Sequence, residues 1–414
     1  MSKLALLGGT PVLAKHPDHF SWPRAVESAR ESLKRTLNSG IWGTLGPENE
    51  RFAAKYAAYC HTKHCLPVLN GTISLELIFR ALDIGWGDEV IVSPYTFSAS
   101  VHSIVLAGAM PVFADTDPET FTLLPSSVEE RITPRTKAVL GVHLGGRPFD
   151  FDQIDTITRK HGLILIEDAA HAHGSEWRSR RCGSLGRAGS FSFQASKNLS
   201  CGEGGAITTN DEALYEKLWS LHHNGRAFTE QGYDHPVLGT DARLAEWQCA
   251  ILCAQMERLD KDIERRMRSS DLLDKELSKI PFISVCRKDE RITRNSLHLY
   301  PFRYHSDMLG GLPRRLFLKA LNAENVCFAD EGYCEPIYRM KMLYTEDFKR
   351  MTGRVFSDPS NELPGNELLA SSEGCWFQHT SLLGNDEDIM HIIEAVTRIG
   401  EQAEELKHAF IQEG

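Results

Sequence analysis

Three short segments of the chain carry side chains whose types and order could perform chemistry. Asn70-Gly71-Thr72 lies between a predicted strand and a predicted helix, where backbone N–H groups, the helix dipole and a hydroxyl suit a phosphate. A second apolar run, 163–167, ends in Asp168, and a carboxylate is costly to bury without a partner. Lys197 follows a third apolar run that contains Ser192. Taken alone, each has an ordinary alternative: a capped turn, a capping aspartate and a solvated lysine.

Together these segments describe a site for pyridoxal 5′-phosphate (PLP). The coenzyme needs an amine for a Schiff base, a carboxylate for its pyridinium nitrogen and donors for its phosphate. Lys197, Asp168 and the turn at 70–72 supply these three groups. An aromatic side chain to cover the coenzyme ring is available in Pro94-Tyr95-Thr96-Phe97. We therefore predict a PLP site, with no dinucleotide site because no G-x-G-x-x-G follows the first strand.

Two other features raise the question of a metal or of disulfides. Asp168, His171 and His173 stand close together after a predicted strand and are an alternative ligand set for a metal. The ten cysteines are scattered, and no close pair is followed by a second pair at zinc spacing. We predict reduced thiols that act as small hydrophobic residues, and no metal site.

The candidate residues lie in a region, from about residue 50 to 225, that alternates short apolar runs with helical patterns. Apolar, β-branched runs separated by helices are typical of a largely parallel sheet covered on both faces. The loops after such strands meet at one edge of the sheet, where ligands bind. The seven predicted strands are 66–69, 89–93, 111–114, 137–142, 163–167, 189–193 and 206–209.

The pattern changes beyond Arg243 and predicts a smaller α+β domain. A charge-rich helical stretch over 245–280 is expected to form two helices, followed by short strands and a helix near 314–324. A loop rich in Gly and Pro is expected at 357–365, and a final helix from about Asp386. We predict a large domain over residues 1–255 and a small C-terminal domain over 256–414.

Composition narrows the class of protein. The chain is 42% hydrophobic and 25% charged, which is typical of an ordinary globular protein, and its net charge is −10. A mildly acidic protein is poorly suited to general binding of nucleic acids and favours small-molecule ligands. No apolar stretch approaches the ~18 residues that a membrane span needs, and the first twenty residues do not have the pattern of a signal peptide. We expect a cytoplasmic protein that binds neither nucleic acid nor membrane.

The chain resembles the DegT–StrS family of sugar and cyclitol aminotransferases, nearly from end to end. The resemblance rests on the order and spacing of segments such as PVLNGTISLELIFRAL, GDEVIVSPYTFSASVHSI, LILIEDAAHAHGS and GSFSFQASKNLSCGEGGAITT. It implies the aspartate-aminotransferase fold (fold type I), an α/β fold whose large domain has a mostly parallel seven-stranded sheet between helices. It also implies a homodimer with shared active sites.

The resemblance implies roles for individual residues. Lys197 matches the Schiff-base lysine, and Asp168 matches the partner of the pyridinium nitrogen. Phe97 matches the aromatic stacked on the ring, and His171 stands where a His or Gln contacts the ring hydroxyl. The phosphate-binding positions are matched by Gly71, Thr72 and Ser192. Lys197, Asp168 and His171 are thus the expected catalytic residues.

One position departs from the family pattern. Members commonly have Asn in a G-x-N-x-R motif, where it reaches the partner subunit's phosphate, whereas this chain reads Gly239-Thr240-Asp241-Ala242-Arg243. A carboxylate facing a phosphate would repel it. Either Asp241 points elsewhere, for example towards Arg243, or a cation lies between the two anions.

The resemblance also bears on the reaction and its substrate. The family's sugar 3-dehydratases have His where this chain has Lys197, so transamination with ping-pong kinetics is expected. Phe193-Gln194-Ala195-Ser196-Lys197 is closer to the scyllo-inosose aminotransferases and aminohydroxybenzoate synthases than to the nucleotide-sugar aminotransferases. We expect an enzyme of aminocyclitol biosynthesis that moves an amino group from glutamine or glutamate to a keto-cyclitol or keto-sugar. A nucleotide-sugar aminotransferase, an aminohydroxybenzoate synthase-like enzyme and a non-catalytic PLP-binding regulator remain alternatives.

Overall fold

A seven-stranded, mostly parallel sheet forms the centre of the large domain in the computed structural model, which describes residues 2–228, 234–359 and 362–411. The last strand in sequence, β11, runs antiparallel to both of its neighbours, and the other neighbouring pairs are parallel. All seven predicted strands are present, and the fold class is confirmed. In spatial order the strands are β1 (His64–Val68), β11 (Gly205–Thr209), β10 (Ala188–Ser192), β7 (Ile164–Asp168), β6 (Thr136–Val142), β2 (Glu89–Val92) and β3 (Met110–Phe113).

Helices cover both faces of this sheet because successive strand residues point to opposite sides. On β2, Val90 and Val92 pack in one buried cluster, and Ile91 packs in another. Side-chain caps fix where several helices begin, since Asn70, Asp150 and Asp211 each accept a backbone N–H of the first turn. The helices of this region are α2 (Pro47–Cys60), α3 (Gly71–Ala81), α4 (Ala99–Leu106), α5 (Pro125–Glu130), α6 (Phe151–His161) and α7 (Glu212–His222).

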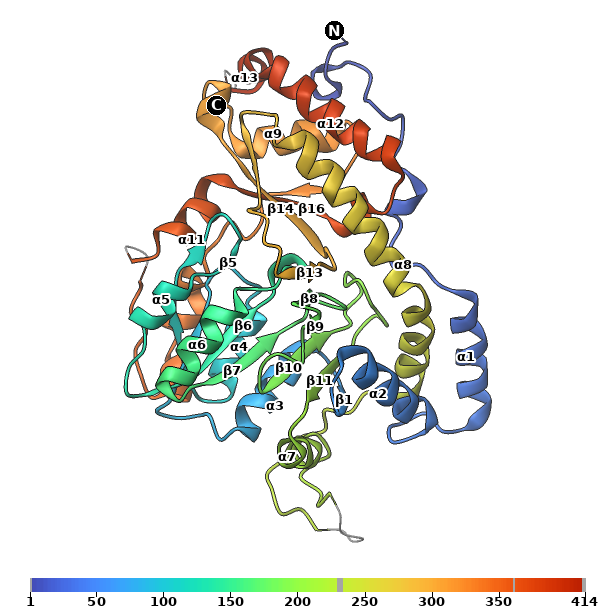
Figure 1. Ribbon diagram of the computed structural model, residues 1–414, viewed down its shortest axis with the longest axis vertical. Helices are drawn as coiled ribbons and strands as arrows, with labels where there is room; N and C mark the ends of the chain where they lie inside the picture. The colour runs from blue at the N-terminus through green and yellow to red at the C-terminus, as the bar shows by residue number, and fades with distance from the viewer. Residues whose placement is uncertain (1, 229–233, 360–361, 412–414) are drawn as a thin grey trace.

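A four-stranded antiparallel sheet lies above the large sheet in Figure 1 and is covered by helices on its outer side. The hydrophobic core between this sheet and its helices also includes Leu4 from the start of the chain. The strands, in spatial order, are β12 (Ile283–Val285), β14 (Leu299–Tyr304), β16 (Gly374–Gln378) and β15 (Ala329–Asp330). The helices are α9 (Arg314–Ala323), α12 (Asp386–Glu401) and α13 (Ala403–Ile411).

One long helix joins the two sheets. The prediction of two helices over 245–280 is wrong: α8 (Glu246–Leu277) is a single 32-residue helix, with α1 (Glu27–Ser39) packed along it (Figure 1). The stretch contains no Gly or Pro to stop it, and the buried Ser269 donates its hydroxyl to Leu382 instead of interrupting the helix. The predicted boundary at residue 255 falls inside α8, so the division of the chain remains a prediction.

Two smaller expectations concern loops and thiols. The expected loop at 357–365 lies partly outside the described residues, and its end begins a short helix, α11 (Pro364–Leu368). All ten cysteines are free thiols, and most of them are buried, as predicted.

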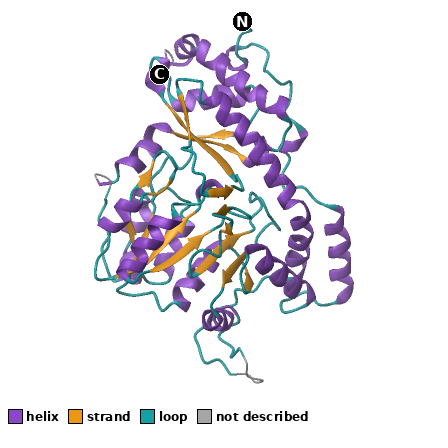
Figure 2. Ribbon diagram, in the orientation of Figure 1, coloured by secondary structure: helices purple, strands orange, loops and turns teal. Residues whose placement is uncertain are grey.

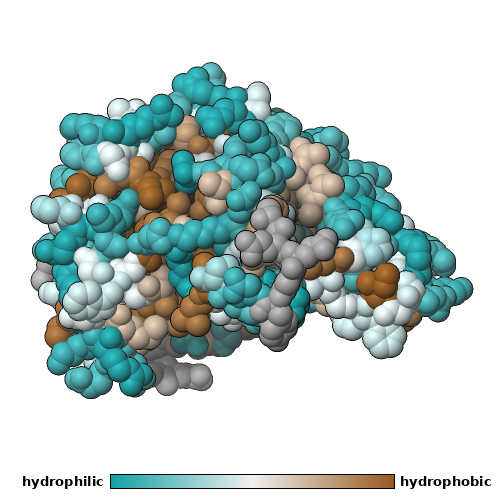
Figure 3. Space-filling model, turned by 90° about the horizontal axis from the view of Figure 1, so that it is seen from below, coloured by the Kyte–Doolittle hydropathy of each residue, from teal (hydrophilic) through white to brown (hydrophobic). Residues whose placement is uncertain are grey.

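The helices are drawn in purple in Figure 2. None of those in the described parts of the chain combines the length and the apolar character that crossing a membrane requires. Seen from below, the surface is mostly hydrophilic, with separate hydrophobic patches (Figure 3).

Candidate active site

A cavity of about 590 Å³ opens at the carboxyl edge of the parallel strands. Residues that follow β2, β6, β7 and β10 line it, and β14 to β16 close it from the small domain. The structure brings all seven predicted site residues to its wall: Gly71, Thr72, Phe97, Asp168, His171, Ser192 and Lys197. Their common position does not test their individual roles, which remain predictions.

The start of α3 forms one end of the cavity. Asn70 caps the helix by accepting the N–H of Ile73 at 2.9 Å, and the N–H groups of Gly71 and Thr72 belong to the unbonded first turn. Ser192 is so close that a Cβ added to Gly71 would lie 3.0 Å from the Ser192 Cβ. This end is therefore a narrow cradle of donors, suited to an anion.

Asp168 ends β7 and is 7% exposed. Its carboxylate accepts the Ser100 hydroxyl at 2.7 Å and the Ala170 N–H at 3.2 Å. Thr96 in turn contacts Ser100, with 3.0 Å between the two hydroxyl oxygens. Among the described residues Asp168 has no ion-pair partner, so this carboxylate is held in place while its charge is left without a cation.

Lys197 lies in the irregular segment after β10 and reaches the same cavity. Burial lowers the pKa of its amine to about 8, and the charge of Asp168 opposes this shift. A lysine with such a pKa is partly neutral near neutral pH, as a nucleophile or a general base must be.

His171 lies beside these two groups as a neutral ring. Its Nδ1 accepts the N–H of Gly145 at 3.2 Å, so in the neutral ring the proton is on Nε2. Burial, together with the charge of Lys197, holds the pKa of His171 well below its usual value. His298 packs on it, with 4.2 Å between ring centroids. His171 is thus a hydrogen-bond donor in this cavity.

Comparison with known proteins identifies the family. The DegT/DnrJ/EryC1/StrS aminotransferase family profile matches residues 23–397. The chain belongs to this family. A relative from Streptoalloteichus tenebrarius, provisionally named an L-glutamine:3-amino-2,3-dideoxy-scyllo-inosose aminotransferase, is 37% identical over 98% of this chain and 100% of its own. The L-glutamine:2-deoxy-scyllo-inosose aminotransferase of the same organism is 34% identical over 96% and 97%.

Solved structures agree with the family assignment. The crystal structure of 3-amino-5-hydroxybenzoic acid synthase superposes with a TM-score of 0.84, at 32% identity, over 94% of this chain and 99% of its own. DesI, solved in the presence of its TDP-sugar product, gives a TM-score of 0.83 at 29% identity over 98% of both chains. The protein is therefore a fold-type I aminotransferase of the sugar and cyclitol type.

The position that departs from the family motif has a local explanation. Asp241 and Arg243 form a two-pronged ion pair, with Nε to Oδ1 at 2.6 Å and Nη2 to Oδ2 at 2.5 Å. Hydrogen bonding to Arg243 lowers the pKa of Asp241. The structure thus shows the first of the two expected alternatives, in which the carboxylate pairs with Arg243.

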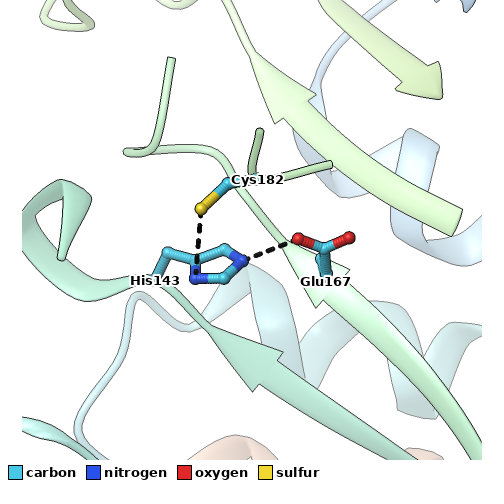
Figure 4. Close-up of side chains that lie close together, drawn as sticks. All are labelled: His143, Glu167 and Cys182. Atoms are coloured by element: carbon cyan, nitrogen blue, oxygen red, sulfur yellow. Dashed lines mark hydrogen bonds and ion pairs between the residues drawn. The ribbon is translucent and has the colours of Figure 1, made fainter. Parts of the chain in front are cut away.

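The metal alternative is not supported by the positions of its residues. His173 is buried in the core, where its Nδ1 contacts the Tyr56 hydroxyl at 2.7 Å and its Nε2 donates to the Ser192 carbonyl at 2.9 Å. A different cluster, His143, Glu167 and Cys182, has three candidate ligand atoms within 4.8 Å of one another (Figure 4).

Hydrogen bonds explain this cluster without a metal. Glu167 accepts His143 Nε2 at 2.9 Å and three backbone N–H groups at 2.7 to 2.8 Å, from residues 183, 185 and 186. Burial raises the pKa of the Cys182 thiol well above its usual value, so the thiol donates to His143 Nδ1 at 3.8 Å. The cluster thereby anchors the loop after residue 181 to the end of β7.

Sequence reasoning missed several residues of the cavity wall. Ser100 stands four residues after Thr96, and this helical spacing was an available signal. His143 directly follows β6, where a polar residue at a parallel strand end is also informative. His298, Asp330 and Tyr333 come from the small domain and carry no local signal.

Proposed function

We propose that the protein uses PLP, held by Lys197 and Asp168, to transfer an amino group from glutamine to a keto-cyclitol. The observation that carries this proposal is the presence of a half-buried lysine and a buried carboxylate in the wall of one cavity. Lys197 has a lowered pKa, and Asp168 lacks a cationic partner among the described residues. A protonated pyridine nitrogen would supply the missing cation, and the narrow cradle at Gly71 would accept the phosphate.

Each residue then has a definite task. Bound PLP supplies an electron sink for the carbon that carries the amino group. Lys197 Nζ would hold the coenzyme and would afterwards remove the proton from Cα of the amino donor. Asp168, oriented by Ser100, would place its negative charge at the ring nitrogen, and His171, whose Nδ1 is occupied by Gly145, would donate from Nε2 to the ring hydroxyl. Phe97, which is 59% exposed at the cavity wall, would cover the ring.

The cavity wall supports an uncharged polyhydroxy acceptor. No arginine of the described chain lines the cavity, and the lining includes polar groups such as Asp330 and Gln378, which bond to each other at 2.9 Å. A nucleotide diphosphate would need more cations than Lys197 alone supplies on this chain. Two relatives are named for glutamine and scyllo-inosose ketones, which agrees with this choice.

The working unit is proposed to be a homodimer. Large apolar side chains lie exposed near the end of α1 and the start of α8, where Trp42 and Trp247 are 50% and 38% exposed with their rings 6.2 Å apart. Exposed apolar patches of this kind are typical of interaction surfaces. The shared active sites and the cytoplasmic location remain predictions.

Trapping of the coenzyme tests the assignment. The protein is loaded with PLP, reduced with borohydride and digested, and the label is expected on Lys197. In a separate sample that is loaded with PLP but not reduced, glutamine alone should bleach the visible absorbance band and release an oxo acid. A keto-cyclitol should restore the band. A regulator would bind PLP without a response to any amino donor, and restoration only by a nucleotide-linked ketone would favour the nucleotide-sugar alternative.

A further inference from the structure

Two carbonyl groups beside the Lys197 side chain are held by residues far away in the sequence. The carbonyl of Ser196 contacts His379 Nε2 at 3.0 Å, and the carbonyl of Lys197 itself accepts the indole N–H of Trp22 at 3.2 Å. Trp22 comes from the segment before α1, and His379 directly follows β16. The peptide that bears the lysine is thus bonded on both sides by separate elements.

The partner of His379 fixes which nitrogen carries its proton. Arg266 Nη2 lies 3.3 Å from His379 Nδ1, and arginine can only donate. Nδ1 is therefore the acceptor, and Nε2 carries the proton that goes to the Ser196 carbonyl. Burial and the charge of Arg266 keep the pKa of His379 well below its usual value, so the ring stays neutral.

Arg266 lowers the stability of the fold at its position. It lies on α8, is 0% exposed and forms no ion pair among the described residues, and its Nε and Nη1 have no hydrogen-bond partner there. Its guanidinium lies 5.9 Å from the centre of the Trp22 ring, and Trp22 meets His379 edge to face at 4.7 Å. Burying an unpaired guanidinium lowers stability, and an apolar residue would fit the core at lower cost.

We propose that Trp22, Arg266 and His379 form a positioning clamp that fixes the peptide of Lys197 and thereby places its Nζ in the cavity. The inference rests on the proposed role of Lys197 and adds three residues that act through it. Arg266 orients His379, His379 and Trp22 hold the two carbonyls, and the contact between their rings joins the two bonds into one unit.

Conservative variants of the loaded enzyme separate this role from a general effect on folding. Trp22→Phe keeps an aromatic ring, smaller than the indole, and removes the N–H, and His379→Leu removes both hydrogen bonds. Each is expected to lower kcat about tenfold with little change in KM, since a hydrogen bond of this kind is worth roughly a factor of ten. Each should also slow the appearance of the visible band when PLP is added to the apoprotein.

His379→Gln is the rescue variant, because its amide can both accept from Arg266 and donate to the Ser196 carbonyl. Its kcat should stay within about threefold of the value for the unmodified enzyme. Trp86→Phe is the matched control, since Trp86 is 76% exposed and lies outside the cavity wall. The clamp is overturned if Trp22→Phe and His379→Leu lower the melting temperature but change neither kcat nor the rate of loading. Borohydride labelling of a lysine other than Lys197 in the unmodified protein would instead overturn the proposed function, and the clamp with it.

Discussion

Glu167 and Asp168 are consecutive carboxylates at the end of β7, and they have opposite surroundings. Glu167 points to the side of His143, where its oxygens accept four hydrogen bonds from the protein. Asp168 points into the cavity, where it accepts two, from Ser100 and Ala170. Glu167 is saturated with hydrogen bonds away from the cavity and stabilises the fold, whereas Asp168 has fewer bonds, lines the cavity and is available to a ligand.

Removal of the Lys197 amine, which lines the same cavity as Asp168, should have the largest effect. Lys197→Ala is expected to lower turnover by at least about a thousandfold, because both the coenzyme anchor and the base are lost. The melting temperature of the apoprotein should not fall, since a half-buried amine without an ion-pair partner among the described residues is removed. Steady-state kinetics and thermal unfolding measure these effects, and Lys137→Ala, at an exposed strand position, is the control. Turnover near that of the unmodified protein would contradict the assignment.

Asp168→Asn tests whether the cavity-facing carboxylate matters through its charge. The amide has nearly the same shape but cannot stabilise a protonated ring nitrogen, so kcat should fall about a hundredfold or more. Ser100→Ala, which removes only the orienting hydroxyl, should cost much less. If the Asn variant is equally active across the pH range, Asp168 is a structural residue like its neighbour.

Glu167→Gln should show the opposite pattern. Its amide nitrogen would face a backbone N–H donor, and the loss of free energy of unfolding is expected to be about 3 kcal/mol. The folded fraction should keep most of its kcat. Denaturant unfolding and active-site titration measure the two quantities, with the exposed Glu130→Gln as control. A large loss of kcat at unchanged stability would erase the contrast between the two carboxylates.

The rate of coenzyme loading should depend on pH through Lys197. Only the neutral amine reacts, and burial lowers its pKa from 10.5 to about 8, so the rate should rise roughly tenfold from pH 7 and level off above about pH 8. In Asp168→Asn the midpoint should move to lower pH, because the charge of Asp168 raises the pKa of this amine. Stopped-flow absorbance follows the reaction, and a midpoint near 10.5 would show that the amine is not buried.

The smallest effect is expected at the position that departs from the family motif. Asp241 pairs with Arg243 and is 55% exposed, and a solvated pair of this kind contributes little. Asp241→Asn should therefore change the dissociation constant of PLP by less than about threefold. A clear gain in affinity would mean that Asp241 faces the phosphate of a neighbouring subunit instead.

The positions of the cavity residues on the large sheet could be predicted because local patterns encode them. Apolar runs place the strands, and Gly71, Asp168 and Lys197 follow strand ends that must meet at one edge. The number of helices over 245–280 could not be predicted from charge alone, and it follows from the lack of Gly and Pro in α8. His298 and Arg266 reach the cavity region through packing of the small domain, and no neighbouring residues mark them beforehand.

The length of α8 has a mechanical consequence. At 1.5 Å per residue, its 32 residues form a rod about 48 Å long, with its first turn beside the large sheet and its last turn in the core of the small domain. Bending such a rod near residue 255 would break several backbone hydrogen bonds at once, in a region where Cys249, Leu252 and Leu259 are buried. Substrate entry by rotation of one domain about this connection would therefore be costly. Entry of substrate and release of product should therefore depend on local movements at the rim of the cavity, such as those of the exposed Phe97.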